Sequence, residues 1–252
     1  MIHQISLIGK RPTNEDNHIC KSKHNYDYYA IFDGHGGNTV SKFLSEIMSK
    51  YFLSKKIKYP LSKSNINKIY DHVHKKLISK HNEIAQVCGS TCLTLIKYDN
   101  NICIYNTGDS RAVICSNNLA IPLTKDHKPN WPEERERITK LGGEIYFDGY
   151  DYRIKDLSVS RAFGDLESVP FITYKPDIYH RKIKKNDKFI VMACDGLWDV
   201  LTNSDVVNYI LDNIEISNNY PKDKRKNIAK NLAEYAIEKG STDNITIIII
   251  FL

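Results

Sequence analysis

Six short runs rich in β-branched and aromatic residues are the feature that most constrains how this chain of 252 residues can fold. Such runs predict β-strands, because branched and aromatic side chains pack well on a pleated surface. Strands that dominate the middle of a chain need other elements to cover them, so the pattern favours a layered fold. The predicted strands are residues 28–32, 91–96, 102–106, 112–115, 188–193 and 245–251.

Two segments in the first third of the chain carry apolar residues at helical spacing, which predicts amphipathic helices. They are residues 40–52 and 66–85, and the region around Pro60 separates them. A short break of this kind favours an antiparallel helix pair, whose apolar sides would cover one face of a sheet.

Two more helices are predicted near the C-terminus, over residues 204–214 and 224–239. Ser204 is a candidate N-cap for the first, and Gly240 would end the second. Strands in the middle with helices packed outside them indicate an α+β layered sandwich. The pattern leaves open the order of the strands within each sheet.

No repeat, low-complexity linker or break in composition divides the chain, so we expect residues 1–252 to form one domain. The net charge of +6 suits acidic partners such as phosphorylated proteins, or nucleic acid. Lysines spread along the whole chain are, however, typical of an ordinary solvated surface. We therefore expect no nucleic-acid partner. Separately, we expect a monomer.

The cysteines and the apolar runs bear on location. None of the six cysteines forms a C-x-x-C pair, which favours reduced thiols and a cytoplasmic and/or nuclear protein. The longest apolar run, residues 245–252, is too short to span a bilayer, and Ile2 excludes N-myristoylation. No membrane partner is expected.

Three aspartates lie where predicted strands end. Asp33 and Asp195 directly follow a strand, and Asp243 comes just before the last one. Gly34 and Gly196 follow two of these acids and would let the backbone turn sharply. A cluster of carboxylates suits hard cations such as Mg²⁺ or Mn²⁺. The alternative is that each Asp-Gly is only a turn, and for a single such pair that is the commoner case.

Seven short blocks, in order along the chain, resemble the signature motifs of the type 2C metal-dependent serine/threonine protein phosphatases. Arg11 and the pair Glu15-Asp16 match that family's opening motif, so the resemblance covers nearly the whole chain. The blocks are Asp33-Gly34-His35-Gly36-Gly37, Gly89-Ser90-Thr91, Gly108-Asp109-Ser110-Arg111, Asp126-His127-Lys128-Pro129, Ser160-Arg161-Ala162-Phe163-Gly164-Asp165, Asp195-Gly196-Leu197-Trp198-Asp199 and Asp243-Asn244.

The resemblance implies a four-layer α-β-β-α sandwich, in which two stacked antiparallel sheets are flanked by helices. It also implies two divalent cations, Mg²⁺ or Mn²⁺, and a third, weaker one. Asp33 would bridge two ions, with Asp195 and Asp243 completing the shell of one. Glu15 and the Gly34 carbonyl would bind the other. The residues matching the third-ion site are Asp109 and Asp199.

The implied reaction is hydrolysis of phosphoserine and phosphothreonine in proteins. A metal-bridging water or hydroxide would attack phosphorus, with no phosphoenzyme intermediate. Arg11 would bind phosphoryl oxygens, His35 would protonate the leaving oxygen, and Asp16 would orient a metal-bound water. Taken without the resemblance, Arg11 could be a surface cation and His35 a turn residue.

Two departures from the family pattern bear on substrate choice. Residues 153–159 lack the Asn-Gly turn usual before the Ser160 block, and residues 166–176 look short for the flap segment that borders the site in the family. A catalytically inactive scaffold is the main alternative function, although every expected acid is present. A nucleic-acid-binding module is less favoured, since the one dense basic cluster, residues 222–226, is short.

Overall fold

The fold is that of a computed structural model, which describes residues 1–218 and 227–252. The basic cluster at residues 222–226 and the first residues of the helix predicted over 224–239 lie outside the described residues. All of the predicted strands fall within them.

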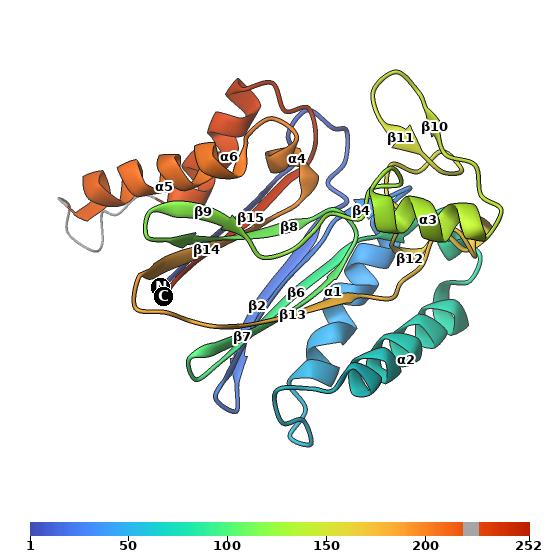
Figure 1. The fold of residues 1–252 in the computed structure, drawn as a ribbon, viewed down its shortest axis with the longest axis horizontal. Coiled ribbons are helices and arrows are strands. Elements are labelled where there is room, and N and C mark those ends of the chain that lie inside the picture. The colour runs from blue at the N-terminus through green and yellow to red at the C-terminus, as the bar shows by residue number, and fades with distance from the viewer. Residues whose placement is uncertain (219–226) are drawn as a thin grey trace.

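Two five-stranded antiparallel sheets form the centre of the molecule (Figure 1). The first has the order β1 (Ile2–Leu7), β15 (Ile245–Phe251), β14 (Asp187–Ala193), β8 (Arg111–Ser116) and β9 (Leu119–Pro122). The second has the order β13 (Asp177–Lys182), β7 (Asn101–Thr107), β6 (Cys92–Tyr98), β3 (Tyr26–Phe32) and β2 (Asn17–Lys23).

The alternation of side chains along β15 shows how the layers are held together. Ile248 and Ile250 pack with residues of the second sheet, including Ile31 and Leu93. The odd-numbered isoleucines of β15 pack instead against the C-terminal helices. A central strand buried on both faces needs apolar residues at nearly every position, which is why residues 245–251 read as one apolar run.

Helices cover the outer face of each sheet. The helices α1 (Thr39–Phe52) and α2 (Lys63–His81) pack on the second sheet, while α5 (Asn203–Asn218) and α6 (Ile228–Glu238) pack on the first (Figure 1). The predicted four-layer α-β-β-α sandwich is therefore confirmed. No helix in the described part of the chain is long and apolar enough to cross a membrane.

The ends of the helices correct the sequence prediction in detail. Ser204 does not cap α5, because the helix already includes it. The side chains of Thr202 and Asp205 exchange hydrogen bonds with each other's backbone at this end, as a capping box does. The segment predicted as one helix over 66–85 ends at His81 and is followed by a separate 3₁₀ turn, Ile84–Gln86. Gly240, at φ +105°, does follow the end of α6.

Several elements were not predicted. Strands β1, β2, β9 and β13 are the edge strands of the two sheets, and their pattern is weak because β1, β2 and β13 mix apolar with polar residues and β9 has only four residues. The helix α3 (Pro132–Lys140) is highly charged but begins with proline and two glutamates, which favour a helix start. Short pairs complete the fold: β10 (Tyr146–Phe147) with β11 (Tyr152–Arg153), and β12 (Phe163–Gly164) with β5 (Gly89–Ser90) and β4 (Gly34–His35).

Candidate metal centre

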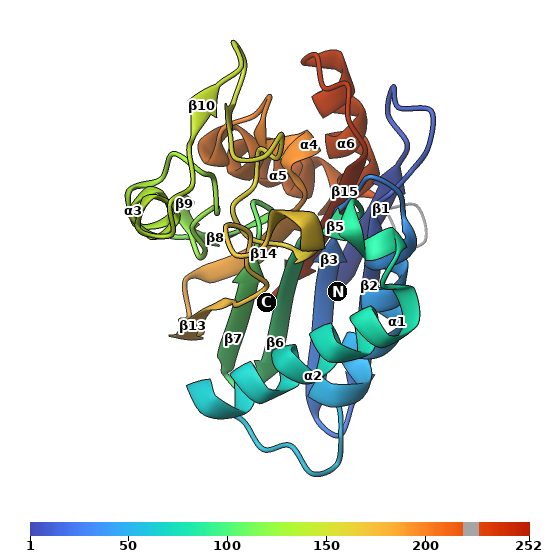
Figure 2. The same cartoon turned by 90° about the vertical axis from the view of Figure 1, so that its right-hand side faces the viewer.

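A cleft of about 380 Å³ opens at one end of the sandwich. Figure 2 shows β5, the short helix α4 (Asp195–Trp198) and the hairpin that contains β10 at this end of the molecule. One wall is the loop between β1 and β2, and the opposite wall is the loop of residues 153–159. The cleft brings together eight of the nine predicted site residues: Arg11, Glu15, Asp33, Gly34, His35, Asp109, Asp195 and Asp243.

Asp33 is held in place by the chain that joins β5 to β6. Its backbone N–H donates to Thr91 Oγ1 at 3.1 Å, and its carbonyl accepts from the Thr91 N–H at 2.8 Å. Thr91 Oγ1 is also 2.9 Å from Ser110 Oγ. Asp33 thus stands at the end of a buried strand with its backbone fixed, as a rigid metal ligand requires.

Asp195 and Asp243 come close because the chain after β14 packs against the chain before β15. A Cβ added to Gly196 would lie 2.1 Å from the carbonyl oxygen of Asn244. Glycine is therefore needed at this position for close backbone approach. Asn244 also holds the first loop, since its side-chain N–H groups donate to the Ile8 and Thr13 carbonyls.

The centre of the cleft concentrates negative charge. Carboxylate oxygens of Asp33, Asp109 and Asp195 lie within 4.8 Å of one another. Burial, together with the charges of neighbouring acids, raises the pKa of both Asp33 and Asp195 well above the usual range. A set of close, buried carboxylates that oppose each other's ionisation fits a divalent cation with oxygen ligands, such as Mg²⁺ or Mn²⁺.

Glu15 and Gly34 meet on the other side of Asp33. A Cβ on Gly34 would lie 2.4 Å from the Glu15 carbonyl oxygen, so Gly34 too is required by close approach. The Glu15 carboxylate accepts from the Gly37 N–H at 3.0 Å, which fixes its direction. Both residues line the cleft, and their role as ligands of a second ion remains a prediction.

Asp109 and Asp199 differ in their surroundings. Asp109 is 1% exposed and accepts a short hydrogen bond from the Lys128 ammonium. Asp199 is the one predicted ligand absent from the described cleft lining. Burial and the charge of Asp109 raise the pKa of Asp199 to about 6, although Lys128 opposes this effect. Lys128 thus lies close to both acids that were predicted to hold a third ion.

Arg11 pairs directly with a predicted metal ligand. Its guanidinium donates to Asp243 Oδ2 at 2.6 Å, and 55% of the Arg11 side chain is exposed. An exposed cation at the rim of an acidic cleft can meet an anionic group of a substrate. The exposure of Arg11 is compatible with the alternative that it is only a surface cation. Its ion pair with Asp243, however, places the guanidinium at the cleft.

His35 has a partner that sequence reasoning missed. Its Nε2 lies 2.8 Å from a carboxylate oxygen of Asp165, which is 2% exposed. Burial would lower the pKa of His35, but the hydrogen bond and charge of Asp165 outweigh burial and raise it. Asp165 ends the fifth of the seven motif blocks, residues 160–165, and its position there was the only signal.

Asp16 lies behind the cleft, buried at 8% exposure, where it accepts a 2.6 Å hydrogen bond from Thr246. Burial raises the pKa of Asp16 to about 6. One oxygen of Asp16 lies within 4.8 Å of Asp33 and Cys194 ligand atoms. Asp16 thus lies beside Asp33 on the buried side of the site, which suits the predicted role of orienting a metal-bound water.

The turn expected to be missing before Ser160 is present without glycine. Lys155 and Asp156 adopt φ values of +49° and +68°, and Ile154 and Leu157 exchange backbone hydrogen bonds of 3.0 Å. This is the geometry of a tight two-residue hairpin turn, which Asp tolerates better than most residues. Residues 153 and 156–159 line the described part of the cleft, and none from 166–176 does.

Comparison with known proteins agrees with these motifs. A family model described as protein phosphatase 2C matches residues 5–245. A PP2C-like domain-containing protein of Acanthamoeba polyphaga mimivirus is 47% identical over 168 residues, covering 60% of this chain and 94% of that protein. Probable protein phosphatase 2C 7 of Oryza sativa subsp. japonica is 33% identical over 254 residues, covering 97% of this chain. The chain spans 64% of the length of the rice protein.

Solved structures share the fold. A serine-threonine phosphatase 2C from Toxoplasma gondii superposes with a TM-score of 0.83 at 20% identity, covering 99% of this chain and 94% of that one. A sex-determining protein of C. elegans superposes with a TM-score of 0.89 at 24% identity, covering 100% of this chain and 64% of that one.

Proposed function

We propose that this chain, which belongs to the protein phosphatase 2C family, is a metal-dependent phosphatase that hydrolyses phosphoserine and phosphothreonine in proteins. The observation that carries the proposal is the group of carboxylates from Asp33, Asp109 and Asp195 within 4.8 Å of one another. It lies in a cleft that is also lined by the guanidinium of Arg11 and the imidazole of His35. Phosphate binding, neutralisation of phosphate charge and proton transfer can therefore occur in one place.

The residues that would hold the ions follow from the cleft. Asp33 would be shared between two divalent cations, with Asp195 and Asp243 on one side and Glu15 with the Gly34 carbonyl on the other. Asp109 and Asp199 would hold a third, weaker ion. Bound Mg²⁺ or Mn²⁺ would supply water of lowered pKa and positive charge beside phosphoryl oxygens. We propose that this water attacks phosphorus directly, with no phosphoenzyme intermediate.

The chain's own side chains supply the remaining steps. Arg11 binds phosphoryl oxygens at the rim and orients the phosphate toward the acids. His35, kept protonated by Asp165, donates a proton to the serine or threonine oxygen as it leaves. Asp16, held by Thr246, orients groups from behind the acids. Phosphorylated proteins are therefore the proposed partners.

The decisive experiment measures phosphate release from a phosphothreonine peptide with Mn²⁺, with and without a chelator. The Asp195→Asn variant should lose activity, because a neutral amide replaces a metal-binding carboxylate. Asp212→Asn is the matched control, since Asp212 is an exposed acid on α5 away from the cleft lining. Wild-type protein that binds Mn²⁺ but releases no phosphate would favour the inactive scaffold instead.

Three further proposals concern the whole protein. Residues 1–252 form a single catalytic domain, which the family match over residues 5–245 supports. The protein is a monomer. It works in the cytoplasm and/or nucleus, a proposal supported by its six cysteines, all of which are free thiols.

A further inference from the structure

The backbone of His127 and its imidazole both bind the turn that carries Asp109. The His127 N–H donates to the Gly108 carbonyl at 3.1 Å, and the Gly108 N–H donates to His127 Nδ1 at 3.1 Å. His127 is only 2% exposed. A single buried residue therefore satisfies both polar groups of the glycine that immediately precedes a predicted metal ligand.

The neighbours of His127 bind residues that follow Gly108 in the same block. Asp126 accepts two hydrogen bonds from the Arg111 guanidinium, at 3.0 and 2.6 Å. The Lys128 ammonium donates to Asp109. Three successive residues of the block at residues 126–129 thus contact three residues of the block at residues 108–111, which gives a structural reason for the first of these motifs, to which the proposed reaction assigns no role.

The hydrogen bond from Gly108 decides which tautomer His127 adopts. Nδ1 must present a lone pair to the Gly108 N–H, so the ring proton has to be on Nε2. A proton on Nδ1 would place two donors against each other. Nε2 is buried and lies 3.3 Å from Asp177 Oδ2, slightly longer than an ordinary hydrogen bond, so the proton faces a carboxylate.

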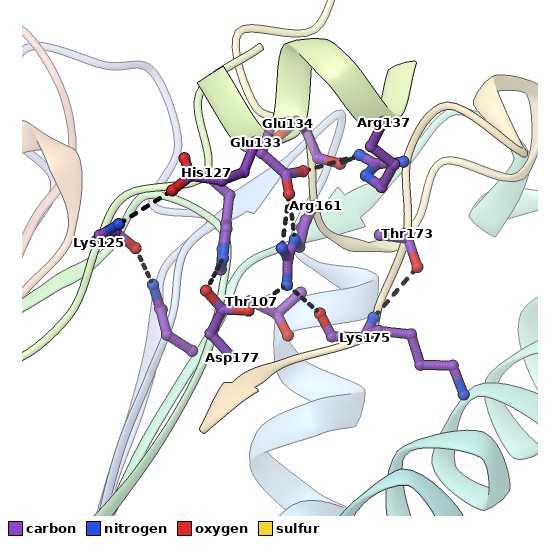
Figure 3. Close-up of polar contacts among 12 residues, drawn as sticks. Thr107, Lys125, His127, Glu133, Glu134, Arg137, Arg161, Thr173, Lys175 and Asp177 are labelled. Carbon is purple, nitrogen blue, oxygen red and sulfur yellow. Dashed lines mark hydrogen bonds and ion pairs between the residues drawn. The ribbon is translucent and has the colours of Figure 1, made fainter. Parts of the chain in front are cut away.

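Asp177 is itself fixed by an ionic network that reaches the buried carboxylate of Glu134 (Figure 3). Its other oxygen accepts from Arg161 at 2.8 Å, and Arg161 makes two hydrogen bonds to Glu134 Oε1, at 2.9 and 2.6 Å. Arg137 binds the second oxygen of Glu134 at 2.8 Å. Figure 3 shows these groups running from α3 to His127 without a break. Asp177 therefore has little freedom to turn away from the imidazole.

We propose that His127 is a positioning residue for Asp109, and that Asp177, held by Arg161, keeps the imidazole in the tautomer that binds the Gly108 N–H. The proposal rests on the proposed metal centre, because Asp109 needs positioning only if it binds an ion. Gly108 adopts φ +106°, and a Cβ there would lie 2.5 Å from the Thr91 side chain. The turn is thus close to the residue that fixes Asp33, and a shift in it would move two acids of the cleft.

The test compares two substitutions of His127 by calorimetric titration with Mn²⁺. His127→Asn keeps an acceptor near the position of Nδ1, whereas His127→Leu removes the acceptor at similar volume. We expect the Leu variant to bind its weakest Mn²⁺ about tenfold less tightly, and the Asn variant to stay within about threefold of wild type. Both lose the contact with Asp177, and the Leu variant also leaves the Gly108 N–H without its acceptor, so its melting temperature in chelator should fall further than that of the Asn variant.

The outcomes separate positioning from plain structural support. Equal weakening of Mn²⁺ binding in both variants, or unchanged binding in the Leu variant, would overturn the role of Nδ1. Asp177→Asn should also weaken Mn²⁺ binding. Unchanged Mn²⁺ binding in this variant would show that Asp177 is not needed to hold the His127 imidazole. A wild type that binds no Mn²⁺ overturns the inference outright. A wild type whose Mn²⁺ binding depends on His127 as expected, yet which releases no phosphate, leaves the inference standing and refutes the proposed phosphatase activity.

Discussion

His35 faces both carboxylate oxygens of Asp165, with Nε2 2.9 Å from Oδ1 and 2.8 Å from Oδ2. The carboxylate is almost fully buried, so water screens the pair weakly. The two residues come from β4 and from the end of β12, which pair with opposite sides of β5. The three-stranded sheet thus brings a proton donor and the acid that controls it together at the edge of the cleft.

Replacing Asp165 by Asn should lower the pKa of His35, because Asp165 is what raises it. Hydrolysis needs protonated His35, so the rate falls as pH rises through this pKa. The basic limb of the pH profile of kcat/KM for a phosphothreonine peptide should therefore move to lower pH. Para-nitrophenyl phosphate, whose leaving group needs no proton, should show a smaller shift. An unchanged peptide profile would contradict the role of His35.

Gly89→Ala should separate the same pair. A Cβ at this position would lie 2.1 Å from Asp165 Oδ2 and 2.4 Å from His35 Nε2. We expect the free energy of unfolding to fall by about 1 to 3 kcal/mol and peptide hydrolysis to drop with it. Gly142→Ala is the matched control, since it meets only backbone strain at φ +82° with no atom within 4 Å. If urea denaturation shows a larger loss in the free energy of unfolding for Gly142→Ala than for Gly89→Ala, the predicted steric clash at Gly89 is wrong.

Asp33→Asn should stabilise the metal-free protein while it abolishes activity. Burial and the charge of Asp195 oppose ionisation of Asp33, so a neutral amide relieves repulsion. In chelator the free energy of unfolding should rise by about 1 to 3 kcal/mol. Added Mn²⁺ should raise the melting temperature of wild type and leave that of the variant almost unchanged. A variant that is less stable than wild type in chelator would show that Asp33 has a structural role.

Arg11→Ala should have opposite effects on substrate and on metal. Removal of the guanidinium takes away a phosphate ligand, so KM for the peptide should rise about tenfold. It also frees Asp243 from the 2.6 Å ion pair, so calorimetry should show Mn²⁺ binding that is equal or tighter. Arg11→Lys keeps the charge without the planar fork, so its KM for the peptide should lie between those of wild type and the Ala variant. Weaker Mn²⁺ binding in the Ala variant would mean that Arg11 supports the ligands instead.

The sequence predicted the central strands and the site far better than the edges of the fold. Residues 245–251 are buried on both faces and so carry a strong signal, whereas β13 is an edge strand rich in charged and polar residues. Asp33, Asp195 and Asp243 were found because each follows or precedes such a buried strand, whereas Glu15 and Asp109 were found only through the family resemblance. Asp165 was missed because its role depends on the pairing of β5 with both β12 and β4, contacts between residues 54 to 75 positions apart that no local pattern encodes.

The same limit applies to turns and to ionic networks. The absence of glycine at residues 155–156 suggested a missing turn, yet these two residues adopt left-handed conformations themselves. Glu134 lies on α3, a helix that the sequence did not predict. Its burial becomes apparent only when α3 packs against Arg161, so its contribution to stability could not be predicted from spacing along the helix.

Glu134→Gln should therefore destabilise the protein in a pH-dependent way. Burial disfavours the ionised carboxylate, but hydrogen bonds from Arg161 and Arg137 outweigh this and lower the pKa of Glu134 from 4.5 to about 2. A depressed carboxylate pKa contributes stability that is fully present above pH 4.5 and is lost as pH falls through 2. The substitution should cost roughly 3 kcal/mol at pH 7, and the difference from wild type should shrink between pH 4.5 and 2.

Glu136→Gln is the matched control for this measurement, because Glu136 lies on the same helix and pairs with Lys140 in solvent. Surface pairs of this kind contribute little, so its free energy of unfolding should stay near that of wild type at every pH. Urea denaturation at several pH values distinguishes the two variants. A loss in Glu134→Gln that does not change with pH would mean that packing, rather than the charge shared with Arg161 and Arg137, holds α3 against the site.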